Sequence, residues 1–454
     1  MKPSPLLEEI RWIEDQLGSQ PDVVAQEIRT GDIEARLVYV CSLCNEKLLN
    51  EQVLRPLFAI GKQSEFESYL LSLPRSIPYP GKEKSVHELM YGYALLLAGS
   101  CVVLLDMREK KNSAVTEADV EKVIQGPQFK LSEDLETSLN LLRHRYHQPS
   151  LFMEKRRIGT ASLTEIALLY DKKRIDPHTL ELIKQELDQV QTDVLFAAGQ
   201  LEKLMAKRKR KLFPTMMTTD RPDRVALNLA QGKAVILIEG TPFALVAPTV
   251  FYDFMSTMDD LYQSVWISGF LIFLRYLGLL ICLLVPALYV AVTAYSPELF
   301  RVQLAFSVAG SRVGVPFPAF LEVLFMLIMM ELLTEASVRL PNVIGSTATT
   351  VGGLILGQAV TQAGLVSDIM IIIVAAVAIS NFVIPINAMS FAVRIAKYFL
   401  LACCIGYGIV GLVVGSIALV AYIVRQESFG QPYFKLFFVP TAKEAQRLQG
   451  GRSG

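Results

Sequence analysis

Residues 398–424 read YFLLACCIGYGIVGLVVGSIALVAYIV, a run of 27 positions without a charged side chain. A helix of about 20 residues crosses the hydrocarbon core of a bilayer, so this run is long enough to span it. The surrounding stretch, residues 262–426, holds 12 charged residues in 165 positions, whereas the other 289 positions hold 76. The sequence therefore predicts an integral membrane protein with a large soluble front half, and it excludes a wholly soluble enzyme.

The apolar sector divides into candidate membrane segments at its polar and charged positions. We place these segments at about 265–294, 315–336, 343–364, 369–393 and 398–424. Pro286 should kink the first segment, and Pro385 with its neighbouring asparagines should bend or break the fourth, whereas the fifth is expected to be uninterrupted. We therefore expect an α-helical transmembrane domain of about four to five membrane segments.

Basic residues lie on both sides of this sector. The run KRKRK at residues 207–211 precedes it, and Arg425 follows it with further basic residues in the tail. Lysine and arginine accumulate on the cytoplasmic side of membrane segments, which places both the front half and the tail in the cytoplasm. Five full crossings would put the tail outside, so one segment should be re-entrant, and 343–364 is the most polar candidate. Arg394 and Lys397 oppose this orientation, and the number of crossings stays open.

The third segment carries a polar stripe. On a helical projection of 100° per residue, five amide and hydroxyl side chains fall within an arc of about 120°. They are Thr347, Thr350, Gln358, Thr361 and Gln362, and the glycines along the neighbouring edge are Gly353, Gly357 and Gly364. We weigh two interpretations evenly. The face makes contacts between helices, where glycine permits close approach, or it forms a pore wall with its glycines packed on the next subunit.

The second segment is acidic, because it carries Glu322, Glu331 and Glu335. Ionisable groups inside a membrane usually face an interior or a water path, and carboxylates at a channel mouth favour cations. Glu331 and Glu335 share one face, whereas Glu322 points roughly the opposite way, so the three cannot all face one lumen. The competing interpretation is salt-bridged glutamates at helix ends, with Arg275 or Arg339 as partner.

The fifth segment contains a GxGxxG pattern that begins at Gly406 and ends at Gly411. That pattern binds a dinucleotide only between a strand and a soluble helix, and an apolar run offers neither. Gly411 and Gly415 instead form a GxxxG face for packing between membrane helices. Cys41 and Cys44 lack the further ligands that a zinc site needs. We therefore predict no catalytic site, no metal, no cofactor and, since the net charge is zero, no nucleic-acid partner.

The front half mixes expected helices and strands. Residues 1–35 are expected to be helical, whereas the apolar runs at 100–107, 164–170 and 233–239 are expected to be strands. This mixture predicts an α/β soluble N-terminal half of two small lobes. We assign residues 1–150 to a cytoplasmic N-terminal lobe, 151–260 to a second α/β cytoplasmic lobe, 261–426 to the transmembrane domain and 427–454 to a C-terminal tail.

Several blocks of the sequence resemble the A subunit of the GerA-type spore germination receptors. In chain order they are TTDRPDRVALNLAQGKAVILIEGTPFALVAPT (218–249), SRVGVPFPAFLEVLFMLIMMELLTEASVRLP (311–341), IGSTATTVGGLILGQAVTQAGLVS (344–367) and SFGQPY (428–433). The resemblance covers about residues 125–440. The chain departs from the family pattern at Gln128-Phe129, where the family has arginine and glutamate after Gly-Pro. It also departs at Arg312-Val313, where the family has Arg-Glu.

The resemblance implies a multi-pass protein of the spore inner membrane, surrounded by lipid. Its implied partners are a transporter-like B subunit and a lipoprotein C subunit. It also implies a homo-oligomer, a pentamer in this family, that opens as a germinant-gated ion channel and triggers germination. A related branch of the family amplifies ion release without sensing nutrient directly.

Our leading prediction is therefore a channel-forming, cation-permeable receptor subunit whose pore is lined by residues 343–364. The alternatives are the amplifying paralogue and a non-conducting membrane scaffold for the receptor complex. A secondary transporter ranks lower, because transporters usually contain internal repeats and more spans, and the sequence reveals neither.

Overall fold

We describe the chain from a computed structural model. It covers residues 5–18, 20–109, 126–205, 211–339 and 342–436, without the side chains of residues 5, 337, 338 and 342–351. The chain forms two compact units. The first comprises residues 1–210, 216–249 and 428–431, and the second comprises residues 211–215, 250–427 and 432–454.

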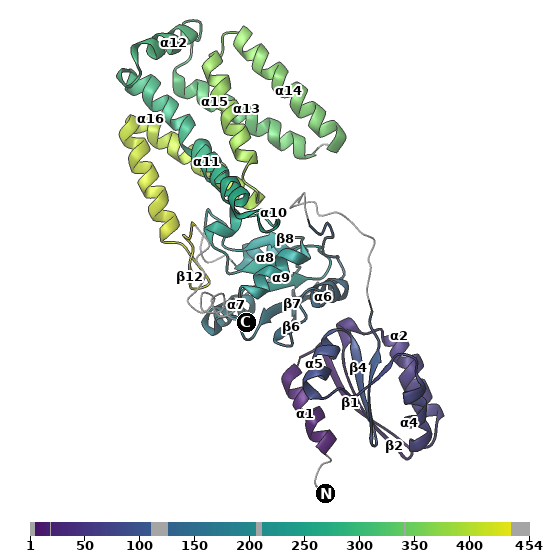
Figure 1. Cartoon of the computed structure of the whole chain (residues 1–454). Coiled ribbons are helices and arrows are strands. Elements are labelled where there is room, and N and C mark those ends of the chain that lie inside the picture. The colour runs from purple at the N-terminus through teal and green to yellow at the C-terminus, as the bar shows by residue number, and fades with distance from the viewer. Residues whose placement is uncertain (1–4, 19, 110–125, 206–210, 340–341, 437–454) are drawn as a thin grey trace. The chain divides into compact units, whose positions relative to one another are not determined.

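The first unit contains two five-stranded antiparallel sheets with helices packed on them (Figure 1). The first sheet has the strand order β1-β2-β4-β5-β3. Its strands are β1 (Val23–Thr30), β2 (Ile33–Val40), β3 (Ser76–Pro78), β4 (Tyr93–Ala98) and β5 (Cys101–Asp106). The accompanying helices are α1 (Pro5–Leu17), η1 (Cys41–Leu43), α2 (Glu46–Leu49), η2 (Asn50–Leu54), α3 (Arg55–Ala59), α4 (Gln63–Ser72) and α5 (Lys82–Met90).

Both faces of this first sheet are buried. Leu95 and Leu97 of β4 pack into the cluster that contains the apolar residues of α1 and α5. Ala94 and Leu96 pack on the other side, against α2, α3 and α4. Successive side chains of a strand point to opposite faces, so an uninterrupted apolar strand serves two cores at once.

The second sheet has the order β6-β7-β9-β10-β8. Its strands are β6 (Leu151–Ile158), β7 (Thr164–Asp171), β8 (Met217–Thr219), β9 (Ala234–Ile238) and β10 (Ala244–Ala247), and its helices are α6 (Leu135–Arg143), α7 (Pro177–Asp188), α8 (Ala198–Met205) and α9 (Pro222–Ala230). One face packs its apolar residues, such as Leu168 and Ile236, against Ile183 of α7 and Leu201 of α8.

The two sheets share one topology. Each strand of the first sheet corresponds to the strand five places later in the second, and every pairing in both sheets is antiparallel. The helix before the fourth strand ends in both lobes at a left-handed glycine, Gly92 (φ 92°) and Gly232 (φ 80°). The front half is therefore an internal structural repeat. Sequence comparison alone missed it, since the matched strands YALLLA and AVILI share only their apolar character.

The expectation that residues 1–35 are helical is wrong beyond α1. Val23–Thr30 pairs with Ile33–Val40 in a hairpin that turns at Gly31. Gly31 has φ 57°, a left-handed conformation that glycine adopts without steric cost. The valine and isoleucine residues on either side favour strands, and this tertiary pairing overrides the helical preference of the neighbouring acidic residues.

Helix α6 joins the two sheets through polar contacts. Arg143 at its end is buried, and its Nε donates to Oδ2 of Asp22 at 3.0 Å. Asn140 donates from Nδ2 to the carbonyl of Ser42 at 2.6 Å. The apolar face of α6 packs on α9 of the second lobe, and α6 also contacts η1 of the first, so this helix bridges the two lobes.

The second unit is helical. Its elements are η4 (Phe251–Phe254), α10 (Asp259–Tyr262), α11 (Val265–Val290) continued by η5 (Ala291–Tyr295), η6 (Pro297–Leu299), α12 (Val302–Arg312), α13 (Ala319–Arg339), α14 (Asn342–Gln362), α15 (Asp368–Phe382) and α16 (Asn387–Val424). Two short strands, β11 (Glu427–Ser428) and β12 (Gln431–Pro432), follow. Within the described ranges, two helices are long and apolar enough to cross a bilayer, Val265–Tyr295 and Asn387–Val424, and Asp368–Phe382 is apolar but shorter.

Helix α16 is broken in its middle. Gly408 has φ 61° and ψ −138°, a backbone conformation that is essentially restricted to glycine. The hydroxyl of Tyr295 donates to the carbonyl of Ile405, one of the groups that lose their helical partner at such a break. The expected uninterrupted fifth segment is therefore two helices, residues 387–407 and 409–424, and the break lies inside the GxGxxG pattern.

The second half of α16 folds back on the first. A Cβ atom at Gly411 would overlap the carbonyl of Cys403, and one at Gly415 would lie 3.2 Å from Leu400 Cδ2. The two halves, coloured yellow-green and yellow, meet at the break in Figure 1. Both glycines of the GxxxG pattern thus lie in the contact between the two halves of α16.

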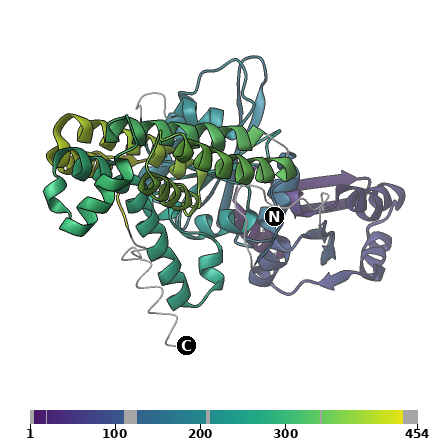
Figure 2. The same ribbon diagram turned by 90° about the horizontal axis from the view of Figure 1, so that it is seen from above.

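The helices of this unit alternate in direction, as comparison with α11 shows. Tyr289 approaches Ser367 at the start of α15, whereas Gly278 lies against Ser380 near its end, so α15 runs antiparallel to α11. Ser390 at the start of α16 bonds Asn381 of α15 at 3.1 Å. Cys404 then reaches the carbonyl of Ala287, so the first half of α16 runs parallel to α11. The view from above shows the long helices lying beside one another (Figure 2).

The remaining two helices complete the alternation. Glu322 near the start of α13 contacts Ser367, whereas Glu331 contacts the first half of α16 closer to that half's start. Helix α13 therefore runs antiparallel to α11. Gly352 of α14 lies 3.4 Å from Leu333, and Gly364 after it returns to the carbonyl of Gly314 just before α13. The described part of the unit thus contains six helical passes of alternating direction, namely α11, α13, α14, α15 and the two halves of α16.

Candidate functional site

The polar stripe predicted for residues 343–364 lies on α14. Gln358 and Gln362 are exposed, and Thr361 is half-buried. The hydroxyl of Thr361 donates to the carbonyls of Gly357 and Gln358, both at 3.0 Å, so it is satisfied within its own helix. The side chains of Thr347 and Thr350 lie outside the described residues. The described part of the stripe therefore presents two amide groups at the surface of this helix.

The glycine edge of α14 divides in two. A Cβ atom at Gly353 would lie 3.5 Å from Leu333 Cδ2, so this glycine packs on α13 of its own chain. A Cβ atom at Gly357 would meet nothing within 4 Å. Gly364 ends the helix with φ 65° and lies 3.1 Å from the carbonyl of Gly314 by the same measure. The open surface of α14 thus carries Gly357, Gln358 and Gln362 together with the exposed apolar side chains of Leu354 and Ile355.

An ion cluster joins α13 to α16. Glu331 accepts from Lys397 Nζ at 3.0 Å through Oε1 and pairs with Arg394 through Oε2. Lys397 is buried, with 4% of its side chain exposed. One carboxylate therefore faces two cations, which leaves an excess positive charge between these helices.

Glu322 lies in a separate place. Its Oε1 accepts from both the backbone N–H and the hydroxyl of Ser367 at 2.6 Å, at the first turn of α15. Its Oε2 lies 3.4 Å from Arg312 Nε. A carboxylate at a helix N-terminus is stabilised by the helix dipole and the free N–H groups. Glu322 thus ties α12, α13 and α15 together, away from the Glu331 cluster.

Glu335 and Arg275 have different partners. Glu335 pairs with Arg339 one turn later at 2.8 Å, and both side chains are exposed. Arg275 of α11 pairs with Asp260, with Nη2 donating to Oδ1 at 3.0 Å. Each of the three glutamates therefore has a cationic neighbour. Of the two arginines expected as partners, Arg339 pairs with Glu335, whereas Arg275 pairs with Asp260, which lies outside α13.

Polar and aromatic contacts mark one end of the helical unit. The hydroxyl of Tyr276 donates to the carbonyl of Leu436 at 2.6 Å. The backbone N–H of Phe251 donates to the carbonyl of Tyr433 at 2.9 Å. The segment before α11 therefore meets the segment after α16. From Tyr276 to Tyr295 the helix has about 20 residues, or about 30 Å, which is the thickness of a hydrocarbon core.

Arg394 and Lys397 were missed as partners of Glu331 in the sequence. Both lie in α16, 63 and 66 positions further along the chain. The available signal was their rarity, because few charges interrupt residues 262–426. Their spacing of three residues also places them on one helix face, where a single carboxylate can reach both.

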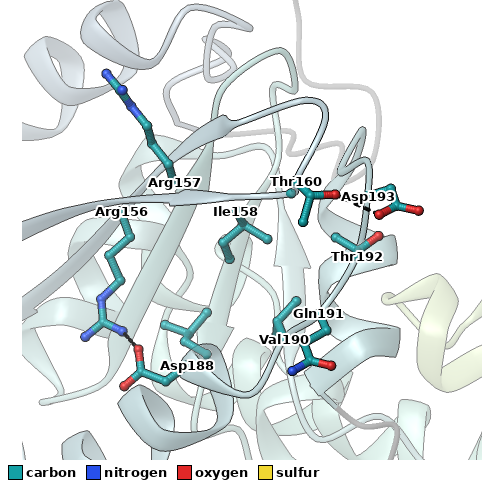
Figure 3. A pocket seen from close by; sticks show the side chains of 11 residues that line it. Arg156, Arg157, Ile158, Thr160, Asp188, Val190, Gln191, Thr192 and Asp193 are labelled. Atoms are coloured by element: carbon teal, nitrogen blue, oxygen red, sulfur yellow. Dashed lines mark hydrogen bonds and ion pairs between the residues drawn. The ribbon is translucent and has the colours of Figure 1, made fainter.

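An open pocket of about 720 Å³ lies in the first unit between the end of β6 and the loop after α7 (Figure 3). Three of its charged groups have partners: Arg156 pairs with Asp188, and Asp193 accepts from the hydroxyl of Thr160 at 2.7 Å. Arg157 points away from these groups in Figure 3. Arg156, Asp188 and Asp193 of the pocket lining thus have partners, and the polar face of α14 is the stronger candidate site.

The two thiols of the CxxC pattern are in structural positions. Cys41 donates to Glu46 at 3.1 Å, and Cys44 donates to the carbonyl of Gly92 at 3.4 Å. Burial is the main cause that raises the pKa of each thiol to about 12. Thiols with such a high pKa stay protonated at neutral pH, which disfavours both metal ligation and nucleophilic chemistry.

The fold defines a class of protein in which duplicated α/β lobes precede a helical unit with candidate membrane helices. Comparison with known proteins gives the family. The family model described as "Bacillus/Clostridium GerA spore germination protein" matches residues 11–449. The chain belongs to this family of spore germination proteins, and the resemblance noted in the sequence blocks is confirmed.

Two relatives illustrate the match. The chain is 34% identical to spore germination protein GerLA of Bacillus cereus over 94% of this chain and 89% of that protein. It is 33% identical to spore germination protein KA of Bacillus subtilis over 94% of this chain and 81% of that protein. The chain is also similar to a crystal structure of the N-terminal domain of the A subunit of the Bacillus megaterium spore germinant receptor GerK3. The two are 22% identical with a TM-score of 0.42, and the match covers 53% of this chain and 94% of that one.

Proposed function

We propose that this chain is the A subunit of a spore germination receptor, and that it oligomerises in the spore inner membrane into a germinant-gated cation channel. Family membership supports the germination role. The pore assignment rests on one observation, the exposed amide face of α14 beside an open glycine edge. In a lipid-facing helix such amides would have no partners, so their exposure favours a water path or a second copy of the chain.

The proposed arrangement has residues 1–150 and 151–260 as cytoplasmic lobes, 261–426 as the membrane domain and 427–454 as the tail. Six alternating passes return the chain to the end where it started. This even number agrees with basic residues on both sides of the sector, and no re-entrant segment is needed. Of the tail, residues 437–454 lie outside the described residues, as do residues 207–210 of the basic run.

The proposed partners are further copies of the chain, in a pentamer, and the transporter-like B and lipoprotein C subunits. Glu322, Glu331 and Glu335 have cationic neighbours within this chain. They are therefore weaker candidates for the lumen than Gln358 and Gln362. The cytoplasmic lobes would serve assembly or gating.

Substitution of the amide face tests the pore. Gln358→Leu and Thr361→Leu should slow ion release or change the conductance of the purified protein in vesicles, because the first removes an exposed amide and the second replaces a half-buried hydroxyl with a larger apolar side chain. Ile355→Leu is the matched control, since Ile355 is exposed on the same helix and the change stays apolar. Wild-type ion release from both variants would remove residues 343–364 from the pore.

A non-conducting scaffold is the rival. A well-folded oligomer that carries no ion flux in vesicles would favour it. Flux that needs no germinant and no B subunit would instead favour the amplifying paralogue.

A further inference from the structure

Helix α12 occupies the connection between α11 and α13. It has 11 residues, Val302–Arg312, and is about 16 Å long, too short to cross a hydrocarbon core of about 30 Å. Both neighbours place it at one end of the helical unit. Tyr295 before it bonds Ile405 beside the break in α16, and Glu322 after it caps α15. This end is opposite to the end marked by Tyr276 and Leu436.

The outer face of α12 is apolar. Val302, Ala305, Phe306 and Ala309 follow the i, i+3, i+4, i+7 spacing of one helix face. Val302 is 70% exposed and Phe306 is 72% exposed. Val308, on another side of the helix, is buried against the rest of the unit, whereas Leu304 beside it is 52% exposed.

The flanking polar groups fit a lipid headgroup layer. Gln303, Ser307 and Ser311 are polar and lie beside the apolar stripe. Arg301, immediately before the helix, is exposed. Phe300 and Phe317, at the two ends of this connection, add apolar rings of the kind that interfacial helices bury at the acyl boundary. A short helix with an apolar stripe, a neutral polar face and an arginine at its end is suited to lie in the plane of the interface.

We propose that α12 is an interfacial helix whose stripe of Val302, Ala305, Phe306 and Ala309 enters the acyl-headgroup boundary of the leaflet opposite the cytoplasmic lobes. The inference rests on the proposed membrane function, because it needs α11 and α13 to be embedded. The occupant of the stripe is lipid. In this position α12 anchors the start of α13 through Arg312 and Glu322, so the depth of α12 is coupled to the α13–α15 contact.

Tryptophan fluorescence in vesicles tests this proposal on the full chain. The native Trp12 and Trp266 are replaced by phenylalanine, and single tryptophans are introduced as Phe306→Trp, Ser307→Trp or Leu280→Trp. Each protein is reconstituted in phosphatidylcholine–phosphatidylglycerol vesicles with bromine atoms near the top or near the end of the acyl chains. Phe306→Trp should be quenched more strongly by the shallow bromines, and Ser307→Trp by neither.

The Leu280→Trp variant distinguishes a failure of the interfacial-helix proposal from a failure of the proposed membrane embedding. Leu280 is exposed in the middle of α11 and should be quenched more strongly by the deep bromines. Deep quenching of Leu280→Trp without quenching of Phe306→Trp overturns the interfacial helix and leaves the membrane function intact. Absence of quenching at both positions overturns the membrane embedding itself. Equal quenching of Phe306→Trp by both lipids shows a transmembrane α12 and also overturns the proposal.

Discussion

At the residue scale, the charges around Glu331 determine how much this residue contributes to the stability of the folded state. One carboxylate is shared by Arg394 and a buried Lys397. Removing one partner of a buried ion pair is strongly destabilising, because the remaining charge keeps its desolvation cost without compensation. An exposed pair such as Glu335 and Arg339 contributes little, since water screens it.

Glu331→Gln should therefore lower the free energy of unfolding by about 3 kcal/mol. Glu335→Gln on the same helix should change it by less than about 1 kcal/mol. Thermal denaturation of the purified protein in detergent compares the two. Equal stability of both variants would show that the Glu331 cluster contributes nothing to the folded state.

Glu202 in α8 predicts a pH effect in the soluble half. Burial raises the pKa of its carboxyl from an ordinary 4.5 to about 7. The folded state then holds a proton that the unfolded state releases between these values. Stability is complete below pH 4.5 and falls as the pH rises to about 7, by at most about 1.4 kcal/mol per pH unit.

Glu202→Gln should remove that dependence. The variant should melt at a higher temperature than the wild type at pH 8 and at the same temperature at pH 4.5. Melting curves at several pH values give the comparison. A wild-type melting temperature that rises from pH 5 to pH 7 in parallel with that of the variant would contradict the assignment.

The three membrane glutamates show how far a sequence specifies individual contacts. Helical periodicity alone separates Glu322 from Glu331, and the structure places them against different helices. The pairing of Glu335 with Arg339 is local, so the spacing of four residues was enough to suggest it. The partners of Glu331 lie more than 60 residues away, and only the packing of α13 on α16 brings them together.

At the element scale, α16 depends on glycines at its turn. Gly408 has a conformation that side chains disfavour, and a Cβ atom there would lie 2.9 Å from the ring of Tyr295. Gly406, two positions earlier in the same motif, has no neighbour within 4 Å of its Cβ position. The two glycines should therefore differ sharply in their tolerance of alanine.

Gly408→Ala should destabilise the fold by about 2 kcal/mol, the strain of a left-handed non-glycine residue, with a further loss from the contact with Tyr295. Gly406→Ala should be neutral or slightly stabilising, because alanine favours helix. Thermal stability and the yield of membrane-inserted protein provide the readout. A stable Gly408→Ala protein would mean that α16 continues through this position.

Composition could not reveal the break in α16. An uncharged run of 27 residues is compatible with one helix or with two short helices, since apolar residues suit both. The GxGxxG pattern offered the needed signal, because repeated glycines permit a tight turn as well as close packing. The turn at Pro385 was easier to expect, since an interior proline removes a helical hydrogen bond and kinks or breaks the helix, although α11 accommodates Pro286.

At the scale of the whole molecule, the alternating direction of the helices bears on the proposed sides of the membrane. Phe251 and Tyr433 are bonded to each other, so the segments that enter and leave the helical unit lie at the same end. In the sequence, basic residues placed both ends of the sector on the same side, but five crossings would have placed the tail on the other side. With the fifth segment divided at Gly408, the proposed six passes agree with the basic residues on both sides of the sector.

Cysteines placed in a cysteine-free protein check the sides. Glu427→Cys, just after α16, should react with an impermeant maleimide from the side of the cytoplasmic lobes. Glu298→Cys, just after α11, should react only from the opposite side. Vesicles of known orientation are labelled before and after permeabilisation. Labelling of both sites from one side in intact vesicles would exclude the six-pass arrangement.

The duplicated sheets have a consequence for biosynthesis. A nascent chain contains two sets of strands with one connectivity, and neighbouring repeats can misassemble by exchanging equivalent strands. The first sheet ends at Asp106, before β6 begins at Leu151, so a ribosome can release one finished set before the competing set emerges. The divergence of YALLLA from AVILI also makes an exchanged strand a poor fit. Vectorial synthesis and the divergence of the strand sequences would together limit misassembly of the two lobes.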